Sequence, residues 1–295
     1  MKILITGGSG FIGSHVIRKI QKNHQIIACS RNQKVNKKNL LWIKCSIDEL
    51  EKNKNRIINF KPECLIHLAW EGIPNFTKSN CNKNFIMSKK FVAFLIKFTK
   101  IKKIIISGTC FEYKEYQGEC TENNKIIPKS YFIKSKIKLL KFVKEKVKNT
   151  KIKFYWLRLF YVYGPNQRKD SLIPHCINSL KKGRIPKIKN PDNINDFVYV
   201  DDVAIGIKKI LKNNPKSGIY NIGSGKPKDL KTIVELIAKI FSKKKFLFNY
   251  KKNTKEKLQF WSNNKKIKKY LNWEPKTTLE IGLKKTIRSY KLLNK

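Results

Sequence analysis

Three glycines near the start of the chain have a spacing that can hold a phosphate. The segment TGGSGFIGSH places Gly7, Gly10 and Gly13 after the apolar run KILIT and before apolar residues at helical spacing. Glycines permit a tight turn and a close approach of the backbone to a pyrophosphate, and the start of a helix adds oriented N–H groups. The segment therefore predicts a dinucleotide site that includes Gly7, Gly10, Phe11, Ile12 and Gly13.

The residues at the tip of the second apolar run distinguish the two nicotinamide dinucleotides. An acidic residue at this tip would bind the ribose 2′-hydroxyl of NAD(H). The chain has Ser30 and Arg31 instead, a hydroxyl and a guanidinium that suit a 2′-phosphate. We therefore predict that NADP(H) is preferred and NAD(H) is possible, with an ordinary surface charge as the alternative interpretation of Arg31.

The elements that position these residues alternate between strand and helix patterns. Such alternation is typical of an α/β protein with a Rossmann-like, doubly wound parallel sheet. One predicted helix follows the glycines up to Asn23, and another carries apolar residues on one face from Ser135 onward. Buried strands are predicted at 2–6, 25–30, 40–45, 63–69, 103–107 and 153–159.

The pattern of the sequence changes after Gly164, where the apolar segments become shorter and prolines more frequent. We predict an NAD(P)-binding Rossmann domain over 1–165 and a smaller C-terminal α/β lobe, mainly for substrate binding, over 166–295. About 196–222 is expected to return to the core. Two later helices are predicted near 229–242 and 279–292, and the lysine-rich segments 241–246 and 249–257 are expected to be solvated loops.

Composition limits the class of protein. A chain of 295 residues with 41% hydrophobic content can bury one large core, or one core and a smaller lobe. No stretch has the pattern of a signal peptide or of a membrane span, so a cytoplasmic location is expected. The seven cysteines are scattered and form no CxxC pair, which favours reduced thiols and predicts no metal site.

The net charge of +46 would ordinarily suggest nucleic acid or an anionic membrane as a partner. The lysines are spread over the whole chain, however, and motifs that read nucleic acid are absent. We therefore expect neither nucleic-acid binding nor membrane insertion. A positive field would still attract an anionic substrate such as a nucleotide diphosphate.

The order and spacing of several motifs resemble the extended branch of the short-chain dehydrogenase/reductase superfamily, which contains nucleotide-sugar epimerases, dehydratases and ketoreductases. The matches span nearly the whole chain and include Asn84. The other matching segments are TGGSGFIGSH, HLAW at 67–70, SGTCFEY at 107–113, LRLFYVYGP at 157–165, DFVYVDDVA at 196–204, YNIGSGKP at 220–227 and LNWEP at 271–275.

This resemblance implies roles for further residues. It assigns Leu68 and Ala69 to the wall of the cofactor site and Ser107 to its floor, and it implies that Thr109 hydrogen-bonds the sugar. A turn-capping threonine is the alternative for Thr109. The resemblance also implies a nucleotide diphosphate-linked sugar as substrate and suggests a homodimer built from the two helices that flank the site.

The two residues that follow Thr109 limit which reaction is expected. Family dehydratases carry an Asp-Glu pair where this chain has Cys110 and Phe111. Because a phenyl ring cannot move a proton, 4,6-dehydration is disfavoured. The segments HLAWEGIPNF and GTCFEY are most similar to reductases of nucleotide-linked 4-keto-6-deoxy sugars, and a C4 epimerase is the alternative enzyme.

The family mechanism uses a tyrosine four residues before a lysine, and this pair is altered here. Four residues turn a helix by about 400°, so the two side chains share one face. In the register that Pro128 and the downstream helix support, the lysine is Lys136 and the residue four before it is Phe132. Tyr131 lies five before Lys136 and is rotated by roughly 100° from Phe132.

Three interpretations of this substitution remain. Tyr131 reaches the site through an irregular helix start, or another group such as Thr109, Cys110, water or the substrate donates the proton. In the third interpretation the protein binds cofactor or nucleotide sugar without turnover. Two further departures from the family pattern are Asn195, where an arginine is usual, and Ser46, where an aspartate is common.

Overall fold

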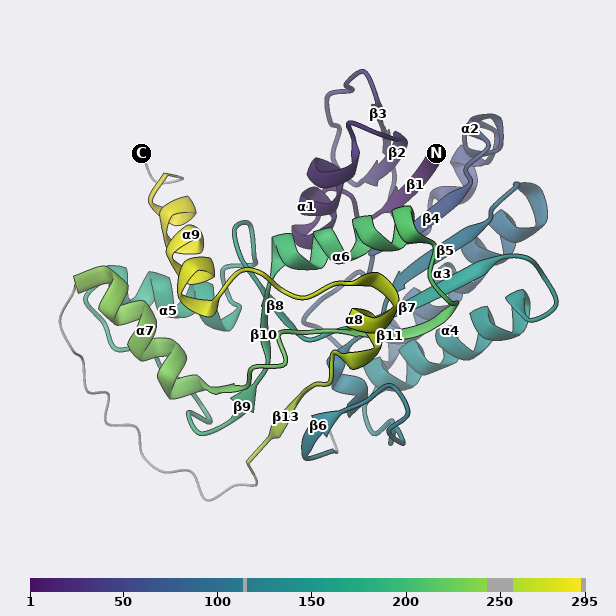
Figure 1. Ribbon diagram of the computed structural model, residues 1–295. Coiled ribbons are helices and arrows are strands. Elements are labelled where there is room, and N and C mark those ends of the chain that lie inside the picture. Colours follow the sequence, from purple (N-terminus) through teal and green to yellow (C-terminus); the bar gives the residue numbers. More distant parts are fainter. Residues whose placement is uncertain (114–115, 243–256, 293–295) are drawn as a thin grey trace. The chain divides into compact units, whose positions relative to one another are not determined.

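The computed structural model describes residues 1–113, 116–242 and 257–292 (Figure 1). These residues form two compact units. The first comprises residues 1–112, 126–158 and 207–220, and the second comprises 113–125, 159–206 and 221–295. The lysine-rich segments 241–246 and 249–257 lie almost wholly outside the described residues.

The first unit is built on a seven-stranded sheet, which confirms the predicted α/β fold class. Its strand order is β11-β7-β5-β4-β1-β2-β3, and parallel pairings join β7 through to β3. The strands are β1 (Lys2–Thr6), β2 (Gln25–Ser30), β3 (Leu40–Lys44), β4 (Cys64–His67), β5 (Lys103–Ser107), β7 (Lys153–Leu159) and β11 (Gly218–Ile222).

The strand order reverses beside β1, because the chain moves outward from β1 to β2 and β3 and then returns to place β4 on the other side of β1. Ligands of open α/β sheets bind outside the carboxyl ends of the strands at such a reversal. Thr6 and His67 pair at the carboxyl ends of β1 and β4, so this register fixes where a ligand site can form.

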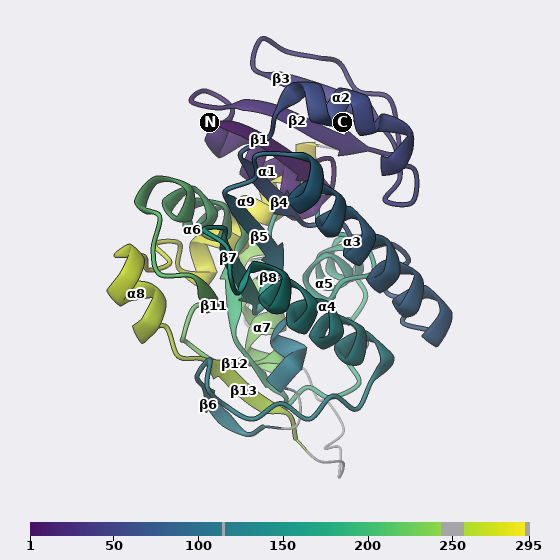
Figure 2. The ribbon, with the colours of Figure 1, turned by 90° about the vertical axis from the view of Figure 1, so that its right-hand side faces the viewer.

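Helices cover both faces of this sheet. Helices α3 and α4 run side by side on one face, and α1 lies on the other (Figures 1 and 2). Apolar residues from α3 and α4, among them Phe91, Leu95, Leu139 and Val143, join Leu65 and other strand residues in one buried cluster. The helices are α1 (Phe11–Ile20), α2 (Lys54–Phe60), α3 (Lys78–Phe98), α4 (Tyr131–Val147) and α6 (Val200–Asn213), with short 3-10 helices η1 (Leu50–Asn53) and η2 (Cys110–Tyr113).

The second unit contains a four-stranded sheet of order β12-β9-β13-β6, a parallel pair β8-β10 and a separate apolar core. That core joins residues of α5, α7 and α9, including Ile177, Ile237 and Ile287. The remaining elements are β6 (Gly118–Cys120), β8 (Tyr161–Tyr163), α5 (Leu172–Lys181), β9 (Ile194–Asn195), β10 (Phe197–Tyr199), β12 (Lys228–Asp229), α7 (Leu230–Ser242), β13 (Gln259–Ser262), α8 (Lys265–Leu271) and α9 (Leu279–Leu292).

Two general features concern the whole described chain. All seven cysteines are buried, and none of them forms a disulfide. In the three described ranges, no helix is both long and apolar enough to cross a membrane.

Candidate active site

The glycine-rich turn lies between β1 and α1, at the carboxyl end of the central strand. Gly7 has φ +70°, and a Cβ there would lie 2.8 Å from the backbone N of Ala69. A Cβ on Gly13 would overlap the carbonyl oxygen of Gly7. Gly10 caps α1 without a side-chain hydrogen bond, so the cap residue itself uses none of the first N–H groups of the helix through a side chain. This turn fits the pyrophosphate of a dinucleotide.

The tip of β2 carries Ser30 and Arg31. Ser30 is buried and its hydroxyl accepts a hydrogen bond from the backbone N of Asn32 at 3.3 Å, whereas Arg31 is exposed. Residues 29–39 contain no aspartate or glutamate, so no carboxylate from this segment would repel a phosphate. The local charge is therefore positive.

A buried histidine fixes the carboxyl end of β4 beneath the predicted cofactor wall of Leu68 and Ala69. The Nδ1 of His67 lies 2.6 Å from Thr6 Oγ1, and its Nε2 lies 2.9 Å from Ser88 Oγ on α3. Burial, followed by the charge of Lys136, lowers the pKa of His67 to about 3. The imidazole is thus neutral near pH 7 and links β1, β4 and α3.

Lys136 and Ser107, predicted separately from the sequence, are in contact. The Nζ of Lys136 donates a hydrogen bond to the carbonyl oxygen of Ser107 at 2.8 Å, at the carboxyl end of β5. Ser107 Oγ lies 3.5 Å from the carbonyl oxygen of His67, on the adjacent strand. Lys136 is only 3% exposed, and this burial lowers its pKa to about 7, an effect that the charge of Glu112 opposes.

Phe132 and Tyr131 have different environments at the start of α4. Ser130 caps the helix by accepting a hydrogen bond from the backbone N of Ile133, so Tyr131 is the first helical residue. Phe132 is 8% exposed and lies on the same side as Lys136, whose Nζ is 5.9 Å from the centre of its ring. Tyr131 is 50% exposed. The structure thus places the phenylalanine, not the tyrosine, beside the lysine.

An aromatic cluster surrounds Phe132 and Lys136. The ring of Phe132 lies 5.4 Å from that of Trp70 and 4.4 Å from that of Phe76, and the Nζ of Lys136 lies 4.1 Å from the Trp70 ring centre. Trp70 lies in the HLAW segment, and the sequence motifs predict no role for it or for Phe76. The available signal for Trp70 is a large aromatic residue directly after Ala69.

Thr109 follows β5 and is held by a buried ionic network. Its backbone N donates to Oε1 of Glu112, and its hydroxyl accepts from the backbone N of Phe111 at 3.2 Å. Glu112 also accepts from Trp156 Nε1 at 2.8 Å and from Arg158 Nε at 2.6 Å. Sequence reasoning missed Glu112 and Arg158, although both occur in quoted motifs, because spacing does not show that they pair.

In the second unit, the DFVYVDD and GSG segments are joined by Asp196. Its buried carboxylate accepts hydrogen bonds from the backbone N atoms of Ser224, Gly225 and Ser262. Asn195, which stands where the family usually has arginine, is 5% exposed, and its Oδ1 accepts no hydrogen bond from the described residues. The motif therefore has a clear structural role through Asp196.

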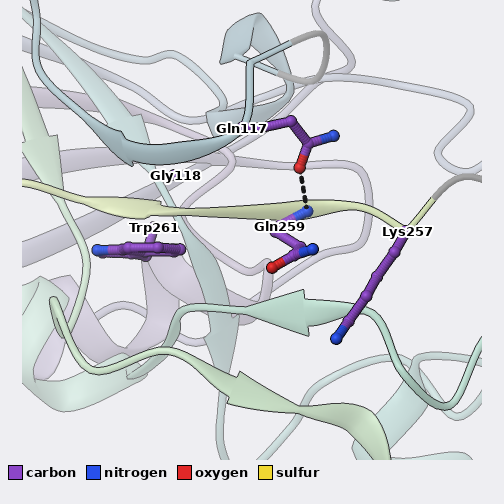
Figure 3. Close-up of a pocket in the computed structure, with 5 residues that line it drawn as sticks. All are labelled: Gln117, Gly118, Lys257, Gln259 and Trp261. Atoms are coloured by element: carbon purple, nitrogen blue, oxygen red, sulfur yellow. Dashed lines mark hydrogen bonds between the residues drawn. The ribbon is translucent and has the colours of Figure 1, made fainter.

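A hollow of about 380 Å³ lies on the four-stranded sheet of the second unit (Figure 3). It is lined by Gln117, Gly118, Lys257, Gln259 and Trp261, and the side chain of Gln117 accepts a hydrogen bond from the backbone N of Gln259 at 3.0 Å. None of the residues predicted to bind cofactor or substrate lines this hollow.

Comparison with known proteins gives the class of protein that this fold and site define. Residues 3–223 match the model of the NAD dependent epimerase/dehydratase family, and the chain belongs to that family. Its members are NAD-dependent enzymes that modify nucleotide sugars, as oxidoreductases, epimerases or dehydratases. The glycine turn described above fits the nicotinamide dinucleotide that the family uses.

Individual relatives act on several nucleotide sugars. The dTDP-6-deoxy-L-talose 4-dehydrogenase (NAD(+)) of Aggregatibacter actinomycetemcomitans is 27% identical over 244 residues, which cover 80% of this chain and 88% of the relative. The solved UDP-glucose 4-epimerase of Thermotoga maritima, with UDP-glucose, has a TM-score of 0.84 and 25% identity with full coverage of both chains. The UDP-glucuronic acid 4-epimerase of Bacillus cereus, with NAD, has a TM-score of 0.86 and 25% identity, again with full coverage.

Proposed function

We propose that the protein reduces the 4-keto group of a nucleotide diphosphate-linked 6-deoxy sugar with NADP(H). The observation that carries the proposal is the buried Lys136 of α4, which donates a hydrogen bond to the last residue of β5, in the same unit as the glycine turn at the end of β1. A relative whose name describes dehydrogenation at C4 of a dTDP-6-deoxy sugar supports the choice of reaction.

The residues after Thr109 favour reduction over dehydration. Removal of water from a hexose needs a general acid and a general base beside the sugar. Cys110 and Phe111 occupy the positions of the acidic pair that family dehydratases carry, and the nearby carboxylate of Glu112 is bound by Trp156 and Arg158. This part of the chain therefore offers a hydroxyl for substrate binding but no free carboxylic acid.

Residues of the first unit would bind the cofactor and the sugar. Gly7, Gly10, Phe11, Ile12 and Gly13 would contact the pyrophosphate, with Leu68 and Ala69 as the wall and Ser107 as the floor of the site. Thr109 would hydrogen-bond the sugar oxygen, and Lys136 would bind the nicotinamide ribose. When bound, the reduced nicotinamide supplies a hydride to the sugar.

NADP(H) is proposed over NAD(H) because the tip of β2 offers Ser30 and Arg31 and no carboxylate. Two of the three relatives described above are named with NAD, so the test is a direct comparison of dissociation constants for NADPH and NADH. NADPH should bind more tightly, and Arg31→Ala should remove most of the difference while leaving NADH binding unchanged. Equal affinities of the unaltered protein for NADPH and NADH would refute the proposed preference for NADP(H).

A C4 epimerase is the second candidate, because the two solved relatives described above are 4-epimerases. An epimerase returns its cofactor to the starting state in each cycle, whereas a reductase consumes one NADPH per product. Loss of NADPH absorbance with a panel of 4-keto nucleotide sugars therefore separates the two. Cofactor binding without turnover of any 4-keto or 4-hydroxy sugar would favour the third candidate, a non-catalytic binding protein with Phe132 in the tyrosine position.

A homodimer through α3 and α4 is also proposed. These helices lie side by side (Figure 2), and Phe98 at the end of α3 is 51% exposed. Light scattering after size-exclusion chromatography should give twice the chain mass of 34.6 kDa. The substitution Phe98→Glu should shift the protein toward the monomer.

A further inference from the structure

The amine of Lys136 lies in an environment that few lysines of so basic a chain share. Its Nζ lies 4.1 Å from the ring centre of Trp70 and 5.9 Å from that of Phe132, and it donates to the carbonyl oxygen of Ser107 at 2.8 Å. An ammonium group has three N–H donors, so this one hydrogen bond leaves two others. Aromatic rings replace much of the water that would otherwise solvate the charge.

We propose that Lys136 is the proton source for reduction of the sugar carbonyl, in place of the tyrosine that Phe132 replaces. This inference rests on the proposed function. An Nζ–H bond of the ammonium breaks and an O–H bond forms at the C4 oxygen, while C4 accepts the hydride that reduced nicotinamide supplies. The ketone becomes an alcohol, and Lys136 is left as a neutral amine that recovers a proton from water.

The charges around Lys136 suit this role. Burial lowers the pKa of Lys136 to about 7, although the negative charge of Glu112 on η2 favours the charged amine. His67 at the end of β4 adds no positive charge, because its own pKa is lowered to about 3. The face of Trp70 attracts the ammonium and keeps it in position. An amine that titrates near neutral pH can both give and regain a proton during turnover.

Other ionisable groups of this region are less suited to donate. Tyr131 is half exposed, whereas Phe132 is buried beside Lys136. Both nitrogens of His67 lie within hydrogen-bond distance of Thr6 or Ser88. Both carboxylate oxygens of Glu112 accept hydrogen bonds, from Trp156 and Arg158 respectively.

The protonation of Lys136 can be measured without any turnover. In protein labelled with [ε-¹³C]lysine, the resonance that disappears in Lys136→Arg belongs to Lys136. We expect this resonance to titrate near pH 7, well below an ordinary lysine pKa of about 10.4. Lys134, which is exposed on the same helix, is the matched control for labelling and assignment. Ordinary titration of Lys136 would overturn the inference.

Kinetics test the proton transfer itself. Arginine keeps the positive charge but cannot be deprotonated, so Lys136→Arg should lower kcat by about 10²–10⁴-fold. The cofactor dissociation constant should change much less. In Lys136→Ala, added methylamine should restore part of kcat in proportion to its protonated form, and Lys134→Arg should behave as the unaltered protein.

Four results separate this inference from the proposed function. Normal kcat in Lys136→Arg, or failure of amines to rescue Lys136→Ala, would overturn the inference alone if the unaltered protein reduces a 4-keto sugar. Loss of kcat in Cys110→Ala or Thr109→Val, with full activity in Lys136→Arg, would also overturn the inference. The proton donor would then be Cys110 or Thr109. Absence of any reduction by the unaltered protein would overturn the proposed function together with the inference.

Discussion

Replacing Glu112 by glutamine should destabilise the protein strongly, because Glu112 and Arg158 form an ion pair with almost no access to solvent. The two side chains are 0% and 2% exposed, and Arg158 Nε lies 2.6 Å from Glu112 Oε2. Glutamine has nearly the same shape and can keep its oxygen toward Trp156. Its amide, however, would face the guanidinium as a second donor and would remove the negative charge that Glu112 places 2.6 Å from Arg158 Nε.

The expected loss follows from the burial of the pair. At an effective dielectric constant of about 20, unit charges at this separation attract by about 6 kcal/mol, much of which offsets the loss of hydration. Removing one partner of a buried pair destabilises a protein by about 3–5 kcal/mol. Since the free energy of unfolding of a domain is about 5–15 kcal/mol, Glu112→Gln should lose a large part of it.

Urea unfolding, followed by tryptophan fluorescence and circular dichroism, measures this change. The matched control is Glu280→Gln on α9, which breaks the exposed pair with Lys284 at 2.7 Å and should change stability far less. The double variant Glu112→Leu, Arg158→Met should be more stable than Glu112→Gln, because neither position then carries a buried charge. A loss below about 1 kcal/mol in Glu112→Gln, or a double variant less stable than Glu112→Gln, would refute the reasoning.

Four further outcomes are expected. Gly13→Ala should weaken cofactor binding at least about tenfold, a change of 1.4 kcal/mol, because its Cβ would overlap the Gly7 carbonyl; fluorescence titration measures this, and unchanged affinity would exclude the turn as the pyrophosphate site. Because the folded pKa of His67 is lowered to about 3 from 6.5, its contribution to stability is present above pH 6.5 and lost as the pH falls toward 3; urea unfolding should show a steeper acid loss in the unaltered protein than in His67→Asn. The pKa of Lys136 is lowered from 10.5 to about 7, so its contribution to the free energy of unfolding is present at high pH and is lost as the pH falls through 7. Lys136→Met should therefore become more stable relative to the unaltered protein as the pH falls from 9 to 6. A difference in stability that does not change with pH would contradict a buried, titrating amine. Phe132→Tyr should raise kcat about tenfold or more by adding a phenol beside Lys136, while Tyr131→Phe leaves kcat unchanged; a fall in kcat in Tyr131→Phe would show instead that Tyr131 reaches the site.

The hydrophobic pattern was sufficient to predict most of the first unit. The predicted strands at 2–6, 25–30 and 103–107 coincide with β1, β2 and β5, because continuous apolar runs are typical of a parallel sheet buried on both faces. The later helices near 229–242 and 279–292 are confirmed as α7 and α9. Helix α4 begins at Tyr131, four residues before Ser135, where the predicted apolar face starts. The earlier start follows from the cap that Ser130 supplies.

The sequence by itself determined the glycine turn, the family and the register that sets Phe132 four residues before Lys136, because these depend on local spacing and helical geometry. Only the tertiary structure decided which groups surround Lys136. Trp70 and Ser107 come from other segments of the chain, and Glu112 meets Arg158 across 46 residues. Burial and charge pairing depend on such distant contacts, so the lowered pKa of Lys136 has no signature in the sequence around it.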